Sequence, residues 1–254
     1  MGGPATAEPE EAPNVVRALK YMYWIATLLG MDYVFTISSG PNYFTRIDTS
    51  DPFNMHNSMP TKVRGRARGC GSRPRRGRRD RPSLRIRQSP QVANTQFSNA
   101  WTVWASGQFI GSVLSRSLSA SFGWRRALGL YVLCMLAGNL MYTLADPSVA
   151  GSLRLAIGGK LVDGLGCGAT ALGIGYIPTM SARPPVASLR MSTFRLFVSV
   201  GMVVATAVSI GLGHVRFSLG GVQFNPGNSP AAVQVLACLP TLAAARADVK
   251  AVDE

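Results

Sequence analysis

The sequence is poor in the residues that build most catalytic and metal sites. It has four cysteines and two histidines in 254 residues, and it contains no Cys-x-x-Cys pair. Cys70 lies in a strongly basic segment, and the other three cysteines lie singly in three different apolar stretches. This distribution gives neither a disulfide framework nor metal-ligand spacing. We therefore expect no metal, no cofactor and no enzymatic activity, and we expect buried, unreactive thiols.

Charge is also missing from long parts of the chain, although the whole sequence has 26 basic and 12 acidic residues. Six windows together contain three charged residues, Asp32, Lys160 and Asp163. The windows are 21–45, 98–115, 127–145, 155–182, 196–213 and 230–245. Soluble helices alternate polar and apolar faces, whereas a bilayer core requires about 20 mostly uncharged residues in succession. The pattern disfavours a soluble enzyme and predicts an all-α membrane protein.

The windows divide the chain into five spans and a shorter sixth stretch. We expect spans at about 21–44, 97–115, 127–145, 153–178 and 192–213, and the sixth stretch begins near 230 and contains Pro240. The predicted organisation is a disordered tail (1–17), a first transmembrane helix with an outer loop (18–60), an Arg-rich low-complexity insert (61–92), transmembrane helices two to five with a partial sixth (93–245), and a polar tail (246–254).

The basic excess comes mainly from one segment. Residues 61–90 hold twelve basic residues and one acid, out of a net charge of +14 for the chain. The short loops place basic residues on one side, with Arg125 and Arg126 in the cytosolic loop between spans two and three, as the positive-inside rule expects. The same topology puts the basic segment outside, so either the topology near span one is unusual or the segment is an insertion. Because it lacks interleaved aromatic residues, we expect no specific nucleic-acid binding, although such segments bind phosphates or anionic lipid non-specifically.

Polar side chains follow helical spacing along four of the five spans. A charge in the middle of a membrane helix is costly, so each one is a functional candidate. The stripes comprise Asp32, Thr36, Ser39 and Tyr43; Trp104, Gln108, Ser112 and Ser115; Lys160, Asp163, Cys167 and Thr170; and Arg195, Ser199, Met202, Thr206 and Ser209. Span three offers mainly Asn139. These faces favour helices around an aqueous path over a passive anchor.

We take Asp32, Gln108, Lys160, Asp163 and Arg195 as candidate residues of a substrate or ion pathway. A structural alternative stays open for Lys160 and Asp163, because side chains three residues apart on a helix can neutralise each other without any transport role. Gly164 and Gly168, four residues apart in span four, predict close helix packing.

Several segments together resemble the first half of a major facilitator superfamily transporter. They are the Ser-Gly-Gln at 106–108, the sequence FGWRR that follows span two, GNLMYTLAD at 138–146, GKLVDGLGCGA at 159–169 and GGVQFNPGNSPAAV at 220–233. The sequence is most similar to the lysosomal ceroid-lipofuscinosis-type facilitators and the SPX-domain vacuolar phosphate transporters. In that group the fourth span opens with an arginine where this sequence has Lys160. Ser117 and Ser121 stand where that group has a glycine and then an Asp or Asn before the basic pair Arg125 and Arg126.

The resemblance implies transmembrane transport of a small solute by a major-facilitator-type half bundle. It implies that spans one and four line the path, that Lys160 and Arg195 suit an anionic solute, and that Asp32 or Asp163 carries a coupling proton. It also implies an integral protein of a vacuolar or lysosomal membrane, whose partners are the lipid bilayer, the solute and a second half-transporter copy. The family has twelve spans, so the alternative is a truncated, non-transporting integral membrane protein.

Overall fold

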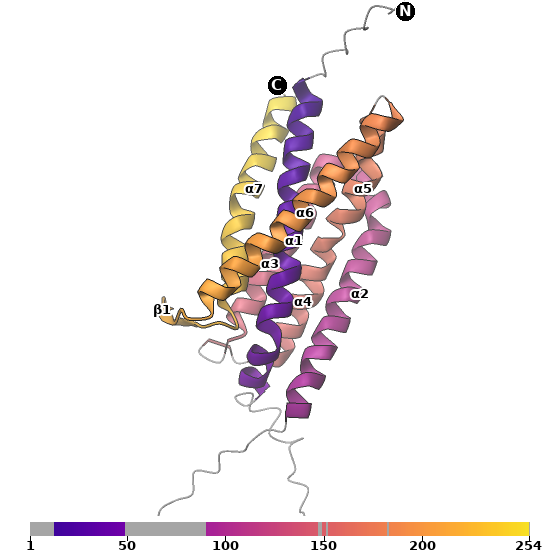
Figure 1. The fold of residues 1–254 in the computed structure, drawn as a ribbon. Coiled ribbons are helices and arrows are strands. Elements are labelled where there is room, and N and C mark those ends of the chain that lie inside the picture. The colour runs from indigo at the N-terminus through magenta and orange to yellow at the C-terminus, as the bar shows by residue number, and fades with distance from the viewer. Residues whose placement is uncertain (1–12, 49–89, 147–148, 151, 182, 254) are drawn as a thin grey trace, which may run out of the picture.

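Helices make up most of the computed structural model, which describes residues 13–48, 90–146, 149–150, 152–181 and 183–253 (Figure 1). The elements are α1 (Pro13–Asp48), α2 (Pro90–Phe122), α3 (Trp124–Leu144), α4 (Leu153–Cys167), α5 (Ala169–Thr179), α6 (Pro184–Leu212), β1 (Phe217–Leu219), β2 (Val222–Phe224) and α7 (Ser229–Asp253). The two strands form one antiparallel hairpin. The prediction of an all-α bundle is confirmed, with the hairpin as an addition.

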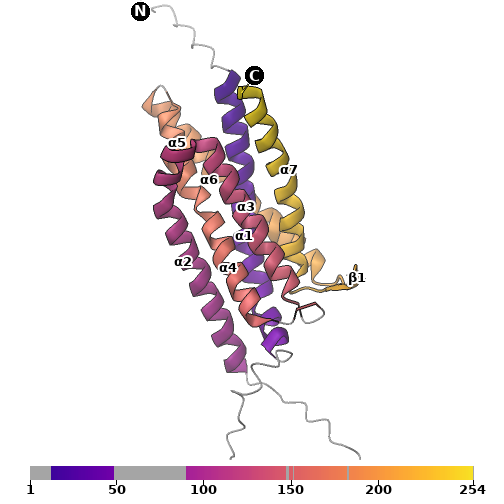
Figure 2. The same ribbon diagram turned by 180° about the vertical axis from the view of Figure 1, so that it is seen from behind.

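The helices run side by side in one elongated bundle. The chain passes from α4 to α5 through Gly168 alone, so these two helices together form the fourth predicted span. In the two opposite views α2 lies along α4 and α7 lies along α1, while α6 crosses α1 obliquely (Figures 1 and 2). Within the described residues, three stretches are long and apolar enough to cross a membrane: Trp124–Leu144, Leu153–Thr179 and Pro184–Leu212. The apolar part of α7, Ser229–Ala243, is shorter, as expected for the sixth stretch.

Helix ends extend further than the sequence predicted. α1 begins at Pro13, inside the predicted tail, α2 begins at Pro90, inside the predicted insert, and α7 continues to Asp253 through the predicted polar tail. A hydropathy window marks the part of a helix that suits lipid, whereas Ala, Arg and Lys also favour helix beyond it. Gly123 alone separates α2 from α3, so there is almost no loop between the second and third predicted spans. Arg125 and Arg126, predicted to lie in that loop, are instead in the first turn of α3. The remainder of the Arg-rich insert, 61–89, lies outside the described residues.

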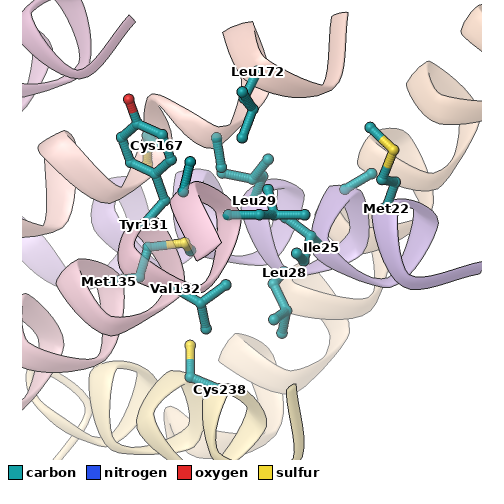
Figure 3. Close-up of a cluster of buried hydrophobic side chains, with 14 of the residues drawn as sticks. Met22, Ile25, Leu28, Leu29, Tyr131, Val132, Met135, Cys167, Leu172 and Cys238 are labelled. Atoms are coloured by element: carbon teal, nitrogen blue, oxygen red, sulfur yellow. The ribbon is translucent and has the colours of Figure 1, made fainter. Parts of the chain in front are cut away.

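The apolar core lies where α1 meets α3 and α5. Its largest cluster joins side chains of α1 to side chains of α3, with Leu172 of α5 and Cys238 of α7 at its edges (Figure 3). The buried members from α1 are Met22, Ile25, Leu28 and Leu29, and those from α3 include Tyr131, Val132 and Met135. Burying each such side chain contributes about 1.5–3 kcal/mol in water, but lipid is itself apolar, so close packing must supply much of the helix association here.

Glycines allow the helix backbones to touch. On the seam between α2 and α4, a side-chain carbon on Gly164 would overlap the backbone carbonyl of Trp104, and one on Gly111 would overlap the carbonyl of Leu165. A carbon on Gly168 would fall within 2.5 Å of the Gly111 backbone. The predicted packing role of Gly164 and Gly168 is therefore confirmed. Similar close approaches join α1 to α6 and α3 to α4, at Gly30, Gly201, Gly138 and Gly159.

These seams predict a sharp difference between two glycines. Gly164→Ala should lower the stability of the detergent-solubilised protein by about 1–3 kcal/mol, because overpacking forces the two helices apart. Gly175→Ala is the matched control, since Gly175 is also helical and has open space around it, and alanine there should raise stability by up to about 1 kcal/mol. Thermal unfolding followed by circular dichroism measures both. Equal midpoints for the two variants would contradict the close α2–α4 contact.

Candidate functional site

Three helices place ionisable and polar side chains around one buried point. α1 contributes Asp32, α3 contributes Asn139, and α4 contributes Lys160 and Asp163. The exposed fraction is 0% for both aspartates, 1% for Asn139 and 3% for Lys160. We call these four residues the charge network. Two of its members, Lys160 and Asp163, are neighbours on α4 by sequence, whereas Asp32 reaches them only through the fold.

The Lys160 ammonium has a full set of contacts inside the charge network. Its Nζ donates to Asp163 Oδ2 at 2.9 Å and to Thr36 Oγ1 at 2.9 Å. It also lies 4.7 Å from the centroid of the Tyr142 ring, within the range of a cation–π contact. With two acceptors and an aromatic face around it, the ammonium is oriented into the bundle. The structural alternative stated above, that Lys160 and Asp163 neutralise each other, thus accounts for one of these contacts.

The Asn139 amide connects the two carboxylates. Its Nδ2 donates to Asp163 Oδ1 at 2.6 Å, to Asp32 Oδ1 at 3.2 Å and to the backbone oxygen of Met135 at 3.0 Å. An amide nitrogen has two hydrogens, so three acceptors compete for two donors. Both aspartates are therefore held against the same nitrogen, and Asn139 fixes the position of each relative to the other.

The charge network holds two carboxyl groups and one ammonium. The second oxygen of Asp32 faces the Cys167 thiol, with Sγ 3.4 Å from Oδ2. If every ionisable group were charged, the network would bury a net negative charge, which is costly in a medium of low polarity. A proton is the smallest ion that can neutralise this excess. The arrangement is thus chemically suited to taking up and releasing one proton.

The other residues predicted from the sequence lie elsewhere. Gln108 is half-buried on α2, and Arg195 is exposed on α6. Arg125 and Arg126 begin α3, where the Arg125 guanidinium lies 5.5 Å from the Trp124 ring centroid. The structure therefore unites Asp32, Lys160 and Asp163, but it does not join Gln108 or the arginines to them.

Sequence reasoning did not assign Asn139, Thr36 or Cys167 to the site. Helical spacing already grouped Thr36 with Asp32 and grouped Cys167 with Asp163, which was a usable signal. Asn139 stood out as the main polar residue of span three, but no sequence pattern linked it to Asp32 and Asp163, which are 107 and 24 residues away along the chain. The side chains of Ser39 and Tyr43, at the far end of the α1 stripe, lie outside the described part of the structure.

A second feature is an exposed face of α1 lined by aromatic rings of α2. Tyr33 is 42% exposed, and its ring centroid is 5.7 Å from that of Trp101. Trp101 stacks on Trp104 at 5.0 Å and lies 6.5 Å from Phe97. We call these four residues the aromatic cluster. Tyr33, Phe97 and Trp101 present flat apolar ring surfaces at the junction of the two helices, while Trp104 is buried beneath them.

The polar stripe of α6 borders the same side of α1. Gly30 of α1 packs against the backbone at Val198 and Met202, and Met202 belongs to the stripe. Tyr33 is one helical turn from Gly30, so it lies on the neighbouring part of the same α1 face. Ser199 and Thr206 of the stripe are exposed. We call this region, from the aromatic cluster across α1 to the α6 stripe, the open face.

The fold matches solved structures of major facilitator superfamily transporters. A crystal structure of a D-xylose–proton symporter matches with a TM-score of 0.65 at 14% identity, covering 91% of this chain and 48% of that one. The inward-open xylose transporter XylE from E. coli matches with a TM-score of 0.64 at 14% identity, covering 92% of this chain and 48% of that one. The partially occluded inward-open form of the same transporter matches with a TM-score of 0.66 at 13% identity, covering 93% of this chain and 48% of that one. This chain thus spans about half the length of those proteins, and the likeness is one of fold.

The family follows from the sequence itself. Residues 27–224 match the family model described as sugar (and other) transporter, so the chain belongs to that transporter family. The matched range contains the charge network, the aromatic cluster and the α6 stripe. No curated protein matches the sequence. The narrower resemblance to lysosomal facilitators and SPX-domain transporters therefore stays a prediction.

The charge network predicts a specific pattern of stability changes. Lys160→Met should destabilise the detergent-solubilised protein by about 3–5 kcal/mol, because it leaves buried carboxylates without their cation. The double variant Lys160→Met with Asp163→Asn should recover most of that loss, since the pair is then removed together. Arg195→Met is the matched control, and removal of this exposed charge should change stability by no more than about 0.5 kcal/mol. Denaturant unfolding followed by tryptophan fluorescence gives all three values. A double variant no more stable than Lys160→Met would refute the pairing.

Proposed function

We propose that this chain acts in the transmembrane transport of a small solute, with the open face lining the path and the charge network carrying a coupling proton. One observation carries the proposal: α1, α3 and α4 share a buried site with two carboxyl groups and one ammonium, directly behind an open face. Membership of the sugar transporter family supports transport, and one of the solved structures with the same fold is that of a D-xylose–proton symporter. Whole facilitators work by rocking two halves about a central site, so a second half bundle is part of the proposal.

Coupling requires that the proton site and the solute path lie close together. Asp32 and Tyr33 are consecutive residues of α1, so one turn of this helix takes part in both features. Successive residues on a helix point about 100° apart, and the two side chains accordingly differ in exposure, 0% for Asp32 and 42% for Tyr33. A change in the charge of Asp32 would therefore act on the open face through a shared segment of backbone.

For the solute, the geometry favours a neutral, hydroxylated ring over an anion. The anion hypothesis relied on Lys160 and Arg195. Lys160 is occupied by Asp163 and Thr36, which leaves Arg195 as the exposed member of that pair. The aromatic cluster offers the exposed ring of Tyr33 and the half-buried rings of Phe97 and Trp101. Aromatic ring faces suit stacking against a sugar ring.

The location and the alternative rest on the sequence. A vacuolar or lysosomal membrane is proposed from the resemblance described above. The alternative function, a non-transporting integral membrane protein, shares the fold and the charge network, because a buried ion pair can serve packing alone. Transport measurements separate these two functions.

The first experiment measures D-xylose uptake into proteoliposomes that contain the full chain, with an imposed pH gradient. Asp32→Asn should reduce gradient-driven accumulation to background, because the site no longer changes charge, while exchange of labelled for unlabelled solute continues. Ser106→Ala, on the exposed side of α2, is the control and should leave both unchanged. Uptake that survives Asp32→Asn together with Lys160→Ala would remove the charge network from the mechanism. Absence of both accumulation and exchange in the unmodified chain would favour the non-transporting alternative.

The second experiment tests the solute class. Trp101→Ala should raise the KM for sugar about 2- to 10-fold with little effect on the maximal rate, because aromatic contacts contribute about 0.5–1.5 kcal/mol each. Trp124→Ala is the matched control, since Trp124 stacks on Tyr176 at the start of α3, away from the aromatic cluster. Inorganic phosphate is tested in parallel. If phosphate competes with sugar and Arg195→Met abolishes the competition, the anion hypothesis is correct and the neutral-solute proposal is wrong.

A further inference from the structure

The β1–β2 hairpin has two chemically different faces. Its register pairs Phe217 with Phe224, Ser218 with Gln223, and Leu219 with Val222. Side chains alternate between the faces of a strand, so one face carries two aromatic and two aliphatic residues and the other carries Ser218 and Gln223. The Phe217 and Phe224 rings stack at 4.8 Å with an angle of 13°. The apolar face is therefore continuous.

The apolar face is left uncovered by the described part of the chain. Phe217 is 48% exposed and Leu219 is 68% exposed, while Val222 and Phe224 are half-buried. A two-stranded hairpin is marginally stable alone in water. Here the turn is formed by Gly220 and Gly221, with φ of 58° and 84°, a geometry that glycine adopts without strain. The exposed face thus needs an apolar environment from elsewhere.

A buried polar cluster anchors the hairpin to the bundle. Asp146, with 0% exposure, accepts from Asn225 Nδ2 at 2.9 Å and from Asn228 Nδ2 at 3.2 Å through its Oδ2. Both amides also donate to the backbone oxygen of Gln223 in β2, at 3.2 and 2.9 Å. Asn228 Oδ1 in turn accepts from the Asn225 backbone N–H at 2.8 Å. The hairpin is therefore fixed relative to the end of α3.

This anchor sets the hairpin at the level where apolar helices end. Asp146 is two residues beyond the end of α3, β1 starts five residues after the end of α6, and α7 begins one residue after Asn228. Both views show the hairpin projecting sideways from the bundle instead of continuing along its axis (Figures 1 and 2). A sideways projection at the ends of membrane helices lies in the plane of the bilayer interface. Aromatic side chains are enriched at that depth.

We propose that the β1–β2 hairpin is an interfacial anchor that inserts Phe217 and Leu219 at the boundary between lipid headgroups and acyl chains. Its occupant is the lipid surface, because the apolar face lies at the bilayer edge and the exposed cation of Arg216 immediately precedes it. Amphipathic elements bind this boundary with their apolar face buried and their charges at the headgroups. The polar cluster around Asp146 holds the hairpin sideways to the bundle, the orientation that places its apolar face in the interface.

The test compares two neighbouring positions in the full chain, reconstituted in phosphatidylcholine vesicles. Leu219→Cys and Ser218→Cys, each in a Cys70→Ser parent, are labelled with a nitroxide, and the labelled parent without an added cysteine gives the background. Both positions are exposed, so neither substitution removes buried packing. The label at 219 should be accessible to molecular oxygen, which concentrates in the acyl region, and several-fold less accessible to a water-soluble nickel chelate than the label at 218.

Equal access of the nickel chelate to positions 218 and 219 would place both strands in water and overturn the proposal. Protection of position 219 from both oxygen and nickel would show that a protein surface, such as a second copy of the chain, covers the hairpin, and would also overturn it. A second variant, Asn228→Ala, loosens the anchor without altering the apolar face. It should reduce the difference between the two positions, and an unchanged difference would show that the polar cluster does not set the angle.

Discussion

The constraint on which the structure depends is the cost of placing Asp32, Lys160 and Asp163 inside a membrane bundle. None of these groups is tolerable there alone, because a low-polarity interior penalises each unpaired charge. The structure meets the cost by contact: Lys160 binds Asp163, and Asn139 holds Asp163 and Asp32 together. These contacts can therefore form only when α1, α3 and α4 all pack in the right register.

Such contacts require close backbones, which explains the glycines. Asp163 and Gly164 are consecutive on α4, and Gly138 and Asn139 are consecutive on α3. A side-chain carbon on Gly138 would overlap the backbone of Asp163. The glycines thus allow α3 and α4 to approach until a short amide can reach a carboxylate. At this point of the fold, close helix packing and hydrogen bonding of the buried polar groups therefore depend on the same glycines.

The bundle keeps the charged groups of Asp32, Lys160 and Asp163 away from the exposed surface. The charge network lies behind α1, while the open face in front presents aromatic rings and hydroxyl groups. The sequence stripes predicted polar helix faces around an aqueous path, and this stays a prediction. α1 contributes Asp32 to the charge network and Tyr33 to the open face, so this helix is the physical link between the two features.

The sequence by itself determined that the chain is a bundle of membrane helices, because charge depletion over about 20 residues is a local property that lipid enforces. It also determined that Lys160 and Asp163 are neighbours and that Gly164 and Gly168 face another helix, since helical spacing fixes both. Only the tertiary structure decided that Asp32 joins this pair through Asn139, and that Asp146, just after α3, binds Asn225, which follows the hairpin 79 residues later. Those contacts depend on which helices lie side by side, and a periodic stripe does not say which neighbour it faces.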